Sequence, residues 1–574
     1  GLSKPSELIQ RCVDYDMPAC ALTDHGSLFG LLEFQGAAKQ AGIKPILGCE
    51  MYIAPGSRKS KSGKSAKEAS NHLVLLCENE TGYHNLCRLS SIGYLEGWHY
   101  RPRIDLEALE EHKEGLILLT ACLQGRVPSL LEQGKQEEAA RTLDTYLGIF
   151  GNDHVYIEMM NHGMPQEERI NPMLWEMAQQ YGLPAVATND SHYLDESDWQ
   201  AHDILLCLQT KKTLDDPNRM RFYNHDFYFR PGDEMAGCFS RWSEAVSNTL
   251  LLAERCNAEI PTNLKLIPNY PVPDGKSKEA YLREQVFEGL HKRFGDELPS
   301  AVVERVEFEL GVISRMQFVD YFLVVWDLLN YARKEGIPVG PGRGSGAGCL
   351  VAYALFITDV NPLQYGLLFE RFLNPERKTM PDIDIDFCIT RREEMIAYSR
   401  RQYGTDCVCQ IVTFGRMLAR NAVHSVARTM GMSPAESKRI AGMIPSEPNI
   451  KLQTALEKEP DLKRAVAEEP EVARLWEMAL RLEGTISSFS THAAGVVICD
   501  HPLTDHIGLF KAAGSDTVVT QVEMKGVGDI GLLKMDILGL RTLTMLDMAV
   551  KLVKKNHKID LDISRLDISD EKTY

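Results

Sequence analysis

The sequence predicts an α/β protein of several domains. Its 574 residues suffice for about three or four domains, and a hydrophobic share of 44% suffices for their cores. In residues 1–250 short apolar runs alternate with helical stretches, which is the rhythm of a parallel sheet or a β/α barrel. Beyond residue 279 a helical region, strand-like runs, a second helical region and further strand-like runs follow in turn. We expect a sheet domain with a helical insertion there.

The expected strands of the first domain are short and apolar, as buried parallel strands are. They are Ala19–Thr23, Leu73–Leu76, Leu116–Leu119 and Pro184–Thr188. Between the first two strands, Gly56–Lys64 reads as a basic, flexible loop. The proline-rich segment Pro261–Lys276 reads as a linker to the next domain.

Composition excludes several classes of protein. A formal charge of −17 argues against a protein that coats nucleic acid without specificity, although residues 389–442 carry nine Arg/Lys against four acids and leave room for a local basic track. Fourteen cysteines without a C-x-x-C pair indicate reduced thiols rather than a disulfide scaffold. The sequence has neither a long apolar run nor a signal-peptide pattern, so we expect a cytoplasmic protein without a membrane partner.

Residues Met380–Phe387 form an acidic alternating strand. Asp382, Asp384 and Asp386 occupy every second position, with apolar residues between them. Side chains alternate across a β-strand, so the three carboxylates share one face and repel one another. Same-face neighbours lie about 6–7 Å apart, which lets them share two divalent ions roughly 3.5–4 Å apart. A solvated edge strand with an acidic face is the alternative that this segment alone leaves open.

A glycine-rich loop, Gly340–Gly348, precedes this strand and leads into an expected helix, Cys349–Ile357. Glycines let the backbone approach a ligand closely, and free N–H groups at a helix start bind phosphate oxygens. Arg343 would add a bidentate phosphate contact, and Ser345 a hydroxyl donor or a helix cap. The loop lacks the Gly-Lys-Ser/Thr of a P-loop. A simple tight turn would also explain its glycines.

Lys534 and Asp536 lie in a later strand-like run and share one face of it. Asp536 would complete a two-metal cluster begun by the acidic strand, and Lys534 would neutralise a triphosphate or a leaving group. A surface ion pair is the alternative for this segment taken alone.

Residues of metal-ligand type follow the predicted strands of the N-terminal third. Strand ends of an α/β barrel converge at one mouth, and imidazole, carboxylate and thiolate groups there suit zinc, manganese or iron. Any one of these histidines alone is better explained as a core or surface residue. The segments are Thr23–Gly26, Gly48–Glu50, Asn71–Leu73, Ala121–Leu123 and Asn189–Tyr193.

Five motifs, in order along the chain, resemble the bacterial DNA polymerase III alpha subunits, the replicative C-family polymerases. The resemblance covers essentially the whole chain, and five ordered motifs are far more specific than any one of them. The motifs are Gly340–Ser345, Leu368–Arg377, Pro381–Phe387, Thr491–Ile498 and Lys534–Thr544.

The resemblance implies a palm similar to the polymerase-beta nucleotidyltransferases, with a helical thumb inserted. In that family three aspartates bind two Mg²⁺ ions and a Gly-Ser turn holds the incoming triphosphate. It gives Asp386 no catalytic role. The matching positions are Asp382, Asp384 and Asp536 for catalysis and Mg²⁺ binding, Gly344 and Ser345 in the turn, and Arg343, Arg371 and Lys534 near the nucleotide.

The implied reaction is template-directed DNA synthesis, in which dNTPs are added to a primer 3′-hydroxyl by two-metal nucleotidyl transfer. The implied partners are primer–template DNA, dNTPs and, in the full-length protein, the sliding clamp and other replicase subunits. The chain departs from many relatives at Ser487–Ser490, where they carry basic residues, so a DNA contact there is in question.

The N-terminal third resembles the polymerase and histidinol phosphatase (PHP) domain, which implies a PHP-type (β/α) barrel with Zn²⁺ or Mn²⁺. The family's first motif, His-x-His, is absent, so we expect an incomplete site. A 3′–5′ exonuclease activity of the parent protein is a hypothesis. The matching ligand positions are His25, Glu50, His72, Cys122, Asp190 and His192.

The resemblance also divides the chain into domains. Because both ends stop in mid-pattern, we expect a piece cut at both ends, with low or no polymerase activity of its own. A stand-alone PHP-type phosphoesterase and a scaffold with structural metal sites are the alternatives. The expected domains are a PHP domain (1–255), a palm in two parts (256–413 and 491–545), a helical thumb (414–490) and the start of the fingers (546–574).

Overall fold

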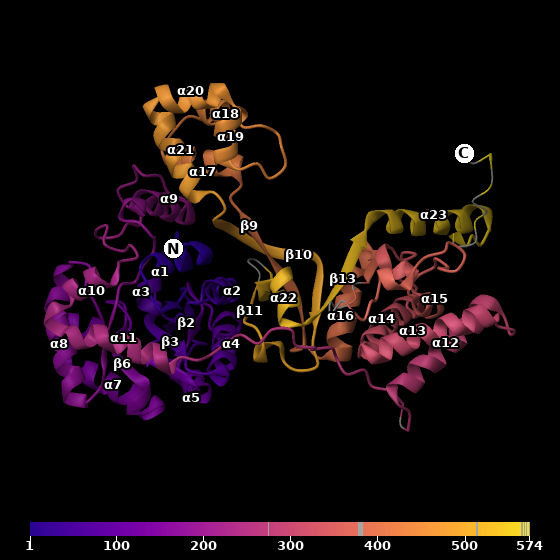
Figure 1. Cartoon of the computed structure of the whole chain (residues 1–574), viewed down its shortest axis with the longest axis horizontal. Coiled ribbons are helices and arrows are strands. Elements are labelled where there is room, and N and C mark those ends of the chain that lie inside the picture. Colours follow the sequence, from indigo (N-terminus) through magenta and orange to yellow (C-terminus); the bar gives the residue numbers. More distant parts are fainter. Residues whose placement is uncertain are drawn as a thin grey trace. The chain divides into compact units, whose positions relative to one another are not determined.

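The protein is described by a computed structural model that covers residues 1–273, 275–376, 381, 383–511, 515–563, 566, 569 and 571–572. The chain forms two compact units, each of which is assembled from separate stretches of sequence (Figure 1). Unit 1 comprises residues 1–260, 413–490 and 504–516. Unit 2 comprises residues 261–412, 491–503 and 517–574.

Unit 1 contains a seven-stranded sheet in the order β1-β2-β3-β5-β6-β7, with β4 paired to β2. Its strands run parallel to their neighbours, except that β3 is antiparallel to both β2 and β5. The α/β architecture expected here is confirmed, although the sheet is mixed rather than parallel throughout. The strands are β1 (Ala19–Leu22), β2 (Lys44–Ile53), β3 (Asn71–Cys77), β4 (Arg103–Ile104), β5 (Leu116–Leu119), β6 (Val155–Met160) and β7 (Ala185–Thr188).

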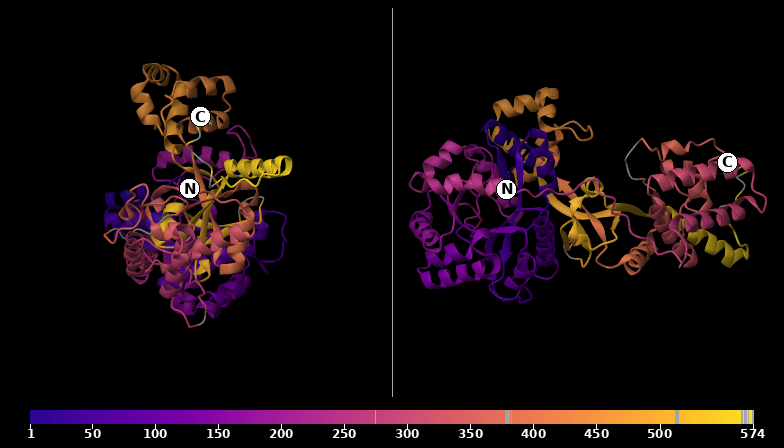
Figure 2. Two further views of the ribbon diagram at one scale, coloured as in Figure 1. Left: turned by 90° about the vertical axis from the view of Figure 1, so that its right-hand side faces the viewer. Right: turned by 60° about the horizontal axis from the view of Figure 1, so that its bottom comes forward.

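Helices alternate with these strands along the chain and lie outside them (Figures 1 and 2). Their ends follow from local chemistry: the Asn79 side chain caps α4 by accepting from Gly82 N, and Gly42 ends α2 in the left-handed region at φ 73°. The helices are α1 (Pro5–Asp14), α2 (Leu31–Ala41), α3 (Ala66–Ala69), α4 (Glu80–Leu95), α5 (Leu106–Glu111), α6 (Arg126–Glu132), α7 (Gln136–Phe150), α8 (Pro165–Tyr181), α9 (Trp199–Thr210), α10 (Gly232–Cys238) and α11 (Ser243–Arg255).

A helical segment also belongs to unit 1. Prolines occupy the first turns of three of its helices, where a missing N–H costs no hydrogen bond. Trp476 and Leu475 centre its core, which continues onto Ile204 of α9. The helices are α17 (Ala419–Thr429), α18 (Pro434–Gly442), α19 (Leu452–Lys458), α20 (Pro460–Glu468) and α21 (Pro470–Leu482); the short strand β11 (Leu509–Lys511) lies against α4 in the same unit.

Unit 2 contains a second mixed sheet, whose strands follow the order β12-β9-β10-β13-β8. β13 runs parallel to β8 and antiparallel to β10, and β12 runs parallel to β9. The helical segment α17–α21 is inserted in the chain between β9 and β10. The strands are β8 (Asp384–Cys388), β9 (Val408–Arg416), β10 (Ile486–Ile498), β12 (Val518–Glu523) and β13 (Leu533–Leu540).

Helices pack against this sheet through one large core, in which α14 alone buries nine residues. The apolar residues Ile385, Phe387, Met535 and Ile537 of β8 and β13 belong to the same core, so the alternate residues face away from it. Within the described residues no helix is long and apolar enough to cross a membrane. The helices that contribute to this core are α12 (Lys278–Phe294), α13 (Ser300–Arg315), α14 (Val319–Lys334), α15 (Leu350–Ala354) and α16 (Arg392–Tyr403). The unit also contains α22 (Met524–Ile530) and α23 (Arg541–His557), and α23 buries none of its residues.

Candidate functional sites

Two carboxylates of unit 2 stand side by side on neighbouring strands. In the parallel pair β8–β13, Asp384 is the register partner of Asp536. Strands in a sheet lie about 4.8 Å apart and register partners point to the same face. Asp536 Oδ1 is buried and accepts no hydrogen bond within the described residues. A buried carboxylate oxygen without a donor suits a hard cation, so the pair fits Mg²⁺. Asp382 lies outside the described residues.

Cationic side chains hold both of these carboxylates. Lys534 Nζ lies 3.1 Å from Asp536 Oδ2, as the shared strand face predicts. Arg343 Nη1 lies 2.9 Å from Asp384 Oδ2, and its Nε lies 3.2 Å from Asp386 Oδ2. Asp386, which had no predicted role, is buried and holds the guanidinium that also contacts Asp384.

The glycine-rich loop lies against the acidic strand. Gly344 has φ 72°, and a Cβ placed on it would lie 3.7 Å from Asp384 Oδ2. Gly340 donates its N–H to Asp386 O over 2.8 Å, and a Cβ there would come within 2.9 Å of Asp386 Cβ. The loop itself is a 3₁₀ turn, Gly344–Gly348, and the helix after it has only five residues. A short turn, rather than the start of the expected helix Cys349–Ile357, therefore carries Ser345, and no contact of Ser345 with the acids is found among the described residues.

Arg305 and Glu309 on α13 anchor this loop. Arg305 donates from Nη2 to Gly348 O (3.1 Å) and Leu367 O (3.3 Å), and from Nε to Glu309 Oε1 (2.6 Å). The fully buried Glu309 accepts from Val351 N over 2.9 Å. Burial raises the pKa of Glu309, although these hydrogen bonds oppose the shift. Sequence reasoning missed both residues, because an Arg and a Glu four apart look like an ordinary surface pair on a helix.

Leu367, whose carbonyl oxygen accepts a hydrogen bond from Arg305, begins the segment that leads to Arg371. That residue is exposed, on the 3₁₀ turn Phe369–Arg371. No contact between Arg371 and the aspartates is found among the described residues. The structure therefore brings Arg343, Gly344, Asp384, Lys534 and Asp536 together, and leaves Arg371 outside this group.

Unit 1 holds a cluster of metal-ligand type. The ligating atoms of His25, Glu50 and His72 all lie within 4.8 Å of one another. His25 Nδ1 is 3.2 Å from Glu50 Oε1, and His72 Nδ1 contacts the same oxygen. Burial raises the pKa of Glu50, but hydrogen bonds from both histidines outweigh it, so the pKa is lowered well below its usual range. The carboxylate is therefore charged, as a metal ligand must be.

The other three predicted ligands adjoin this cluster. Cys122 Sγ lies 3.5 Å from His72 Nδ1, and His192 Nε2 lies 3.4 Å from His25 Nε2. Asp190 Oδ1 is 3.6 Å from His192 Nδ1. The six side chains, three histidines, two carboxylates and one thiol, thus converge from several strands. This donor set fits Zn²⁺ or Mn²⁺.

A buried acid beside the cluster was not predicted. Glu158 lies in the middle of β6, and its Oε1 accepts from Thr188 Oγ1 over 2.7 Å, while Oε2 has no hydrogen-bond partner among the described residues. Burial raises the pKa of Glu158 to about 8, with the charges of Glu50 and Asp190 adding to the shift. The sequence signal that could have identified Glu158 is an acidic residue inside the otherwise apolar run Val155–Met160.

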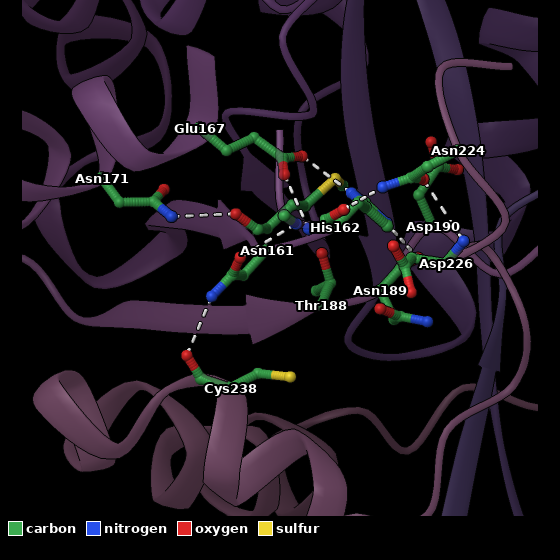
Figure 3. Close-up of polar contacts among 12 residues, drawn as sticks. Asn161, His162, Glu167, Asn171, Thr188, Asn189, Asp190, Asn224, Asp226 and Cys238 are labelled. Carbon is green, nitrogen blue, oxygen red and sulfur yellow. Dashed lines mark hydrogen bonds and ion pairs between the residues drawn. The ribbon is translucent and has the colours of Figure 1, made fainter. Parts of the chain in front are cut away.

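A second unpredicted pair, His162 and Glu167, fastens the Asp190 loop (Figure 3). His162 donates from Nε2 to Asn189 O over 2.7 Å, and its Nδ1 lies 2.7 Å from Glu167 Oε1. Glu167 Oε2 also accepts from His162 N over 2.6 Å. The next residue, Asp190, has φ 45°, a conformation that a non-glycine residue adopts only under constraint. The pair supplies that constraint.

Two known families match different parts of the chain. Residues 280–539 match the family described as the bacterial DNA polymerase III alpha NTPase domain, and residues 1–162 match the PHP domain. An amidohydrolase structure from Chromobacterium violaceum aligns with 33% of the chain at 17% identity, and its TM-score of 0.21 is too low to support a conclusion.

Curated relatives match across nearly the whole chain. A DNA polymerase III subunit alpha from Treponema pallidum is 44% identical over 100% of this chain and 49% of the relative. Proteins of the same name from Thermus aquaticus and Borreliella burgdorferi are each 42% identical, over 97% and 100% of this chain and 51% and 50% of the relatives. The chain spans about half the length of the curated relatives it matches, and it belongs to the family of bacterial DNA polymerase III alpha subunits.

Proposed function

We propose that unit 2 carries the catalytic palm of a template-directed DNA polymerase, which adds dNTPs to a primer 3′-hydroxyl in chromosomal replication. The observation that carries this proposal is the register pairing of Asp384 with Asp536 beside a glycine turn. Two adjacent carboxylates and a close-approach loop are what two-metal phosphoryl transfer needs. The names of the relatives support the same reaction.

The domain assignment follows from this function. Residues 256–413 and 491–545 form the palm, residues 414–490 the thumb, and residues 546–574 the start of the fingers, with a PHP domain in residues 1–255. The inserted helices α17–α21 support the thumb assignment. The partners are primer–template DNA and dNTPs, and in the full-length protein the sliding clamp and other replicase subunits.

In the proposed reaction the acidic residues bind the metal ions and the basic residues and the glycine turn bind the nucleotide. Asp382, Asp384 and Asp536 hold two Mg²⁺ ions, which when bound supply acidification of the primer 3′-hydroxyl and charge stabilisation on the triphosphate. Arg343 and Lys534, which pair with these acids here, turn to the triphosphate oxygens when the acids are otherwise neutralised. Backbone N–H groups at Gly344 and Ser345 and the side chain of Arg371 complete the nucleotide contacts.

Single-nucleotide incorporation and Mn²⁺ binding followed by electron paramagnetic resonance test this proposal together, in a Glu50→Gln background that disables the candidate metal cluster of unit 1. In that background Asp384→Asn and Asp536→Asn should each remove both signals, whereas Asp296→Asn, which alters an exposed acid on the same unit, should change neither. Reading metal binding separately matters because the chain is half the length of its relatives and its own turnover is expected to be low. Retention of Mn²⁺ binding in the Asp384→Asn/Asp536→Asn double variant would overturn the assignment of the site.

For unit 1 we infer a metal-dependent phosphodiesterase site that uses Zn²⁺ or Mn²⁺, with 3′–5′ exonuclease activity as its specific form. The convergence of His25, Glu50 and His72 with Cys122, Asp190 and His192 favours it. Glu158 adds a buried carboxyl of raised pKa, the kind of group that serves as a proton donor. Metal-stimulated release of 3′ nucleotides from an oligonucleotide tests it: the activity should be lost in Glu50→Gln, and its persistence there would exclude this site.

A further inference from the structure

Two surface segments of unit 1, residues 55–70 and 97–103, are held together by one buried arginine. Arg103 is 1% exposed and donates to four carbonyl oxygens: Gly97 O (3.0 Å), Ala69 O (3.3 Å), Arg58 O (3.0 Å) and Ser60 O (2.8 Å). Because a buried guanidinium requires such partners, its bonds fix the backbone of both segments. The loop expected from sequence to be flexible is therefore anchored.

Further contacts complete the anchoring. Tyr100 Oη donates to Lys64 O over 3.1 Å, and His99 Nε2 lies 3.1 Å from Gly63 O. Arg58 pairs with two nearby acids, Asp105 at 2.7 Å and Glu96 at 2.9 Å, while a third acid, Glu68, accepts from Lys64 N over 2.9 Å. The two acids paired with Arg58 are thereby neutralised and do not compensate the lysines of the loop.

The resulting surface is basic and aromatic. Its lysines are exposed and form no ion pair with an acid among the described residues, and its aromatic rings, Trp98 and Tyr100, are 54% and 51% exposed. In a chain of net charge −17, unpaired cations around two exposed rings are an exception. We call this the lysine–aromatic surface, which consists of Lys59, Lys61, Lys64, Trp98, Tyr100 and Arg101.

The lysine–aromatic surface adjoins the candidate metal cluster. Arg101 Nη1 donates to Tyr52 Oη over 2.8 Å, and the Tyr52 ring centroid lies 5.2 Å from that of His72 and 6.3 Å from that of His25. Pro102 lies close to Gly26, the residue after His25, since a Cβ on Gly26 would lie 2.9 Å from Pro102 Cγ. Residues 101–102 thus form the boundary between the surface and the cluster.

We propose that the lysine–aromatic surface binds a single strand of DNA and leads its end to the metal cluster. Lys59, Lys61 and Lys64 contact backbone phosphates, while bases stack on Trp98 and Tyr100, the combination by which proteins hold single strands without reading sequence. Arg101, at the boundary, contacts the phosphate nearest the cluster. The proposal deepens the phosphodiesterase function inferred for unit 1, but binding to this surface is independent of hydrolysis.

Fluorescence anisotropy of a labelled oligothymidylate on the whole chain gives the first test. Lys59→Ala/Lys61→Ala/Lys64→Ala should weaken binding and lower the slope of log affinity against log salt by about 2, since each cation contributes about 0.7 on a single strand. Trp98→Ala should weaken binding about tenfold with an unchanged slope, because it removes stacking but no charge. A triple variant of exposed cations elsewhere in the sequence of unit 1, Lys39→Ala/Lys135→Ala/Arg169→Ala, should bind as the wild type does.

Cross-linking separates this surface from the DNA site proposed in unit 2. An oligonucleotide with photoreactive thiothymidines at internal positions near its 3′ end should form adducts with peptides that contain residues 59–64 or 98–101. Adducts confined to unit 2, or an unchanged affinity and slope in the lysine variant, would overturn the proposal. So would equal competition by polyglutamate at matched charge, which would indicate an acidic protein partner instead. Nucleotide incorporation by the lysine variant should equal that of the wild type, so failure here is distinct from failure of the polymerase proposal.

Discussion

Asp386 holds Arg343: the guanidinium Nε lies 3.2 Å from Asp386 Oδ2, while Nη1 of the same group reaches 2.9 Å from Asp384 Oδ2. The third acid of the alternating strand therefore positions a cation over the second acid. If Asp386 is a positioning residue, Asp386→Asn should raise the KM for dNTP severalfold with a smaller change in kcat, because a neutral amide holds the guanidinium less strongly.

Metal binding separates this role of Asp386 from that of a ligand. In a Glu50→Gln background, which disables the metal cluster of unit 1, Mn²⁺ affinity in Asp386→Asn should stay within about twofold of the parent, whereas Asp384→Asn should lose it, since only the latter removes a proposed ligand. Equal loss of Mn²⁺ in both variants would make Asp386 a ligand and would contradict the positioning role.

Arg305 anchors the loop that carries Gly344 and Ser345. Arg305→Ala removes the donor to Gly348 O and Leu367 O and leaves the fully buried Glu309 without its cationic partner. Breaking a buried pair in this way costs about 3 kcal/mol of unfolding free energy. Differential scanning calorimetry should show the loss in one transition only, that of unit 2.

A milder substitution controls for this effect. Glu309→Gln keeps an acceptor for Val351 N and should cost about 1 kcal/mol, the net value of one hydrogen bond. Because the loop then stays anchored, dNTP binding should survive in Glu309→Gln and weaken in Arg305→Ala. Equal dNTP affinities in the two variants would show that the anchor does not position the nucleotide site.

His162 fastens the loop that carries Asp190 and His192. His162→Asn removes the bond to Asn189 O and the partner of Glu167. Residues that orient metal ligands typically contribute about 10- to 100-fold to metal affinity, so Zn²⁺ affinity of unit 1 should fall by that factor. Isothermal titration in an Asp384→Asn/Asp536→Asn background isolates this site from the one in unit 2.

Asn171→Leu is the matched control for His162→Asn. Asn171 lies on α8, as Glu167 does, and donates to Met160 O of β6 over 2.9 Å. Among the residues drawn in Figure 3 it has no bond to the Asp190 loop. Its loss should lower the melting temperature and leave Zn²⁺ affinity unchanged. A parallel loss of affinity in both variants would reduce the His162 effect to general destabilisation.

His202 gives unit 1 an acid-sensitive component of stability. Burial, with the neighbouring His192 adding to it, lowers the pKa of His202 to about 3. The unfolded chain takes up a proton at about pH 6.5 whereas the folded chain does not, so stability is fully present above pH 6.5 and is lost as pH falls from there toward 3. Between pH 7.5 and 5.5 the free energy of unfolding should fall by about 1.4 kcal/mol because of His202.

Urea unfolding at the two pH values measures that loss. His202→Phe, which keeps an aromatic ring in contact distance of Phe222 and Tyr193, should remove about 1.4 kcal/mol of the pH dependence. Gln209→Ala, a change at an exposed position of the same helix that involves no titratable group, should leave the dependence as it is in the wild type. An unaltered pH dependence in His202→Phe would contradict the shift.

The sequence predicted local features of the candidate sites better than their long-range partners. The alternation of Asp384 and Asp386 with apolar residues predicted one acidic face, and the structure places those apolar residues in the core of unit 2. No local pattern showed that β13 would pair with β8 in the register that sets Asp536 beside Asp384. That pairing joins residues about 150 positions apart, and only tertiary packing specifies it. The proposed roles of these residues stay predictions until metal binding is measured.

The anchored loop shows why one expectation failed. Gly56–Lys64 carries the charge and glycine content of a mobile segment, and its constraint comes from Arg103, some 40 residues further on. The error arose because the stabilising partner lies elsewhere in the chain.

The helical segment leaves the sheet of unit 2 at β9 and returns at β10, and these two strands are immediate neighbours. Since the two points of attachment are adjacent, the segment's length and composition have no bearing on the register that pairs Asp384 with Asp536. Insertions, deletions or wholesale exchange of α17–α21 during evolution would leave the pairing of β8 with β13 as it is. The helical segment and the pair of acids are thus free to diverge independently.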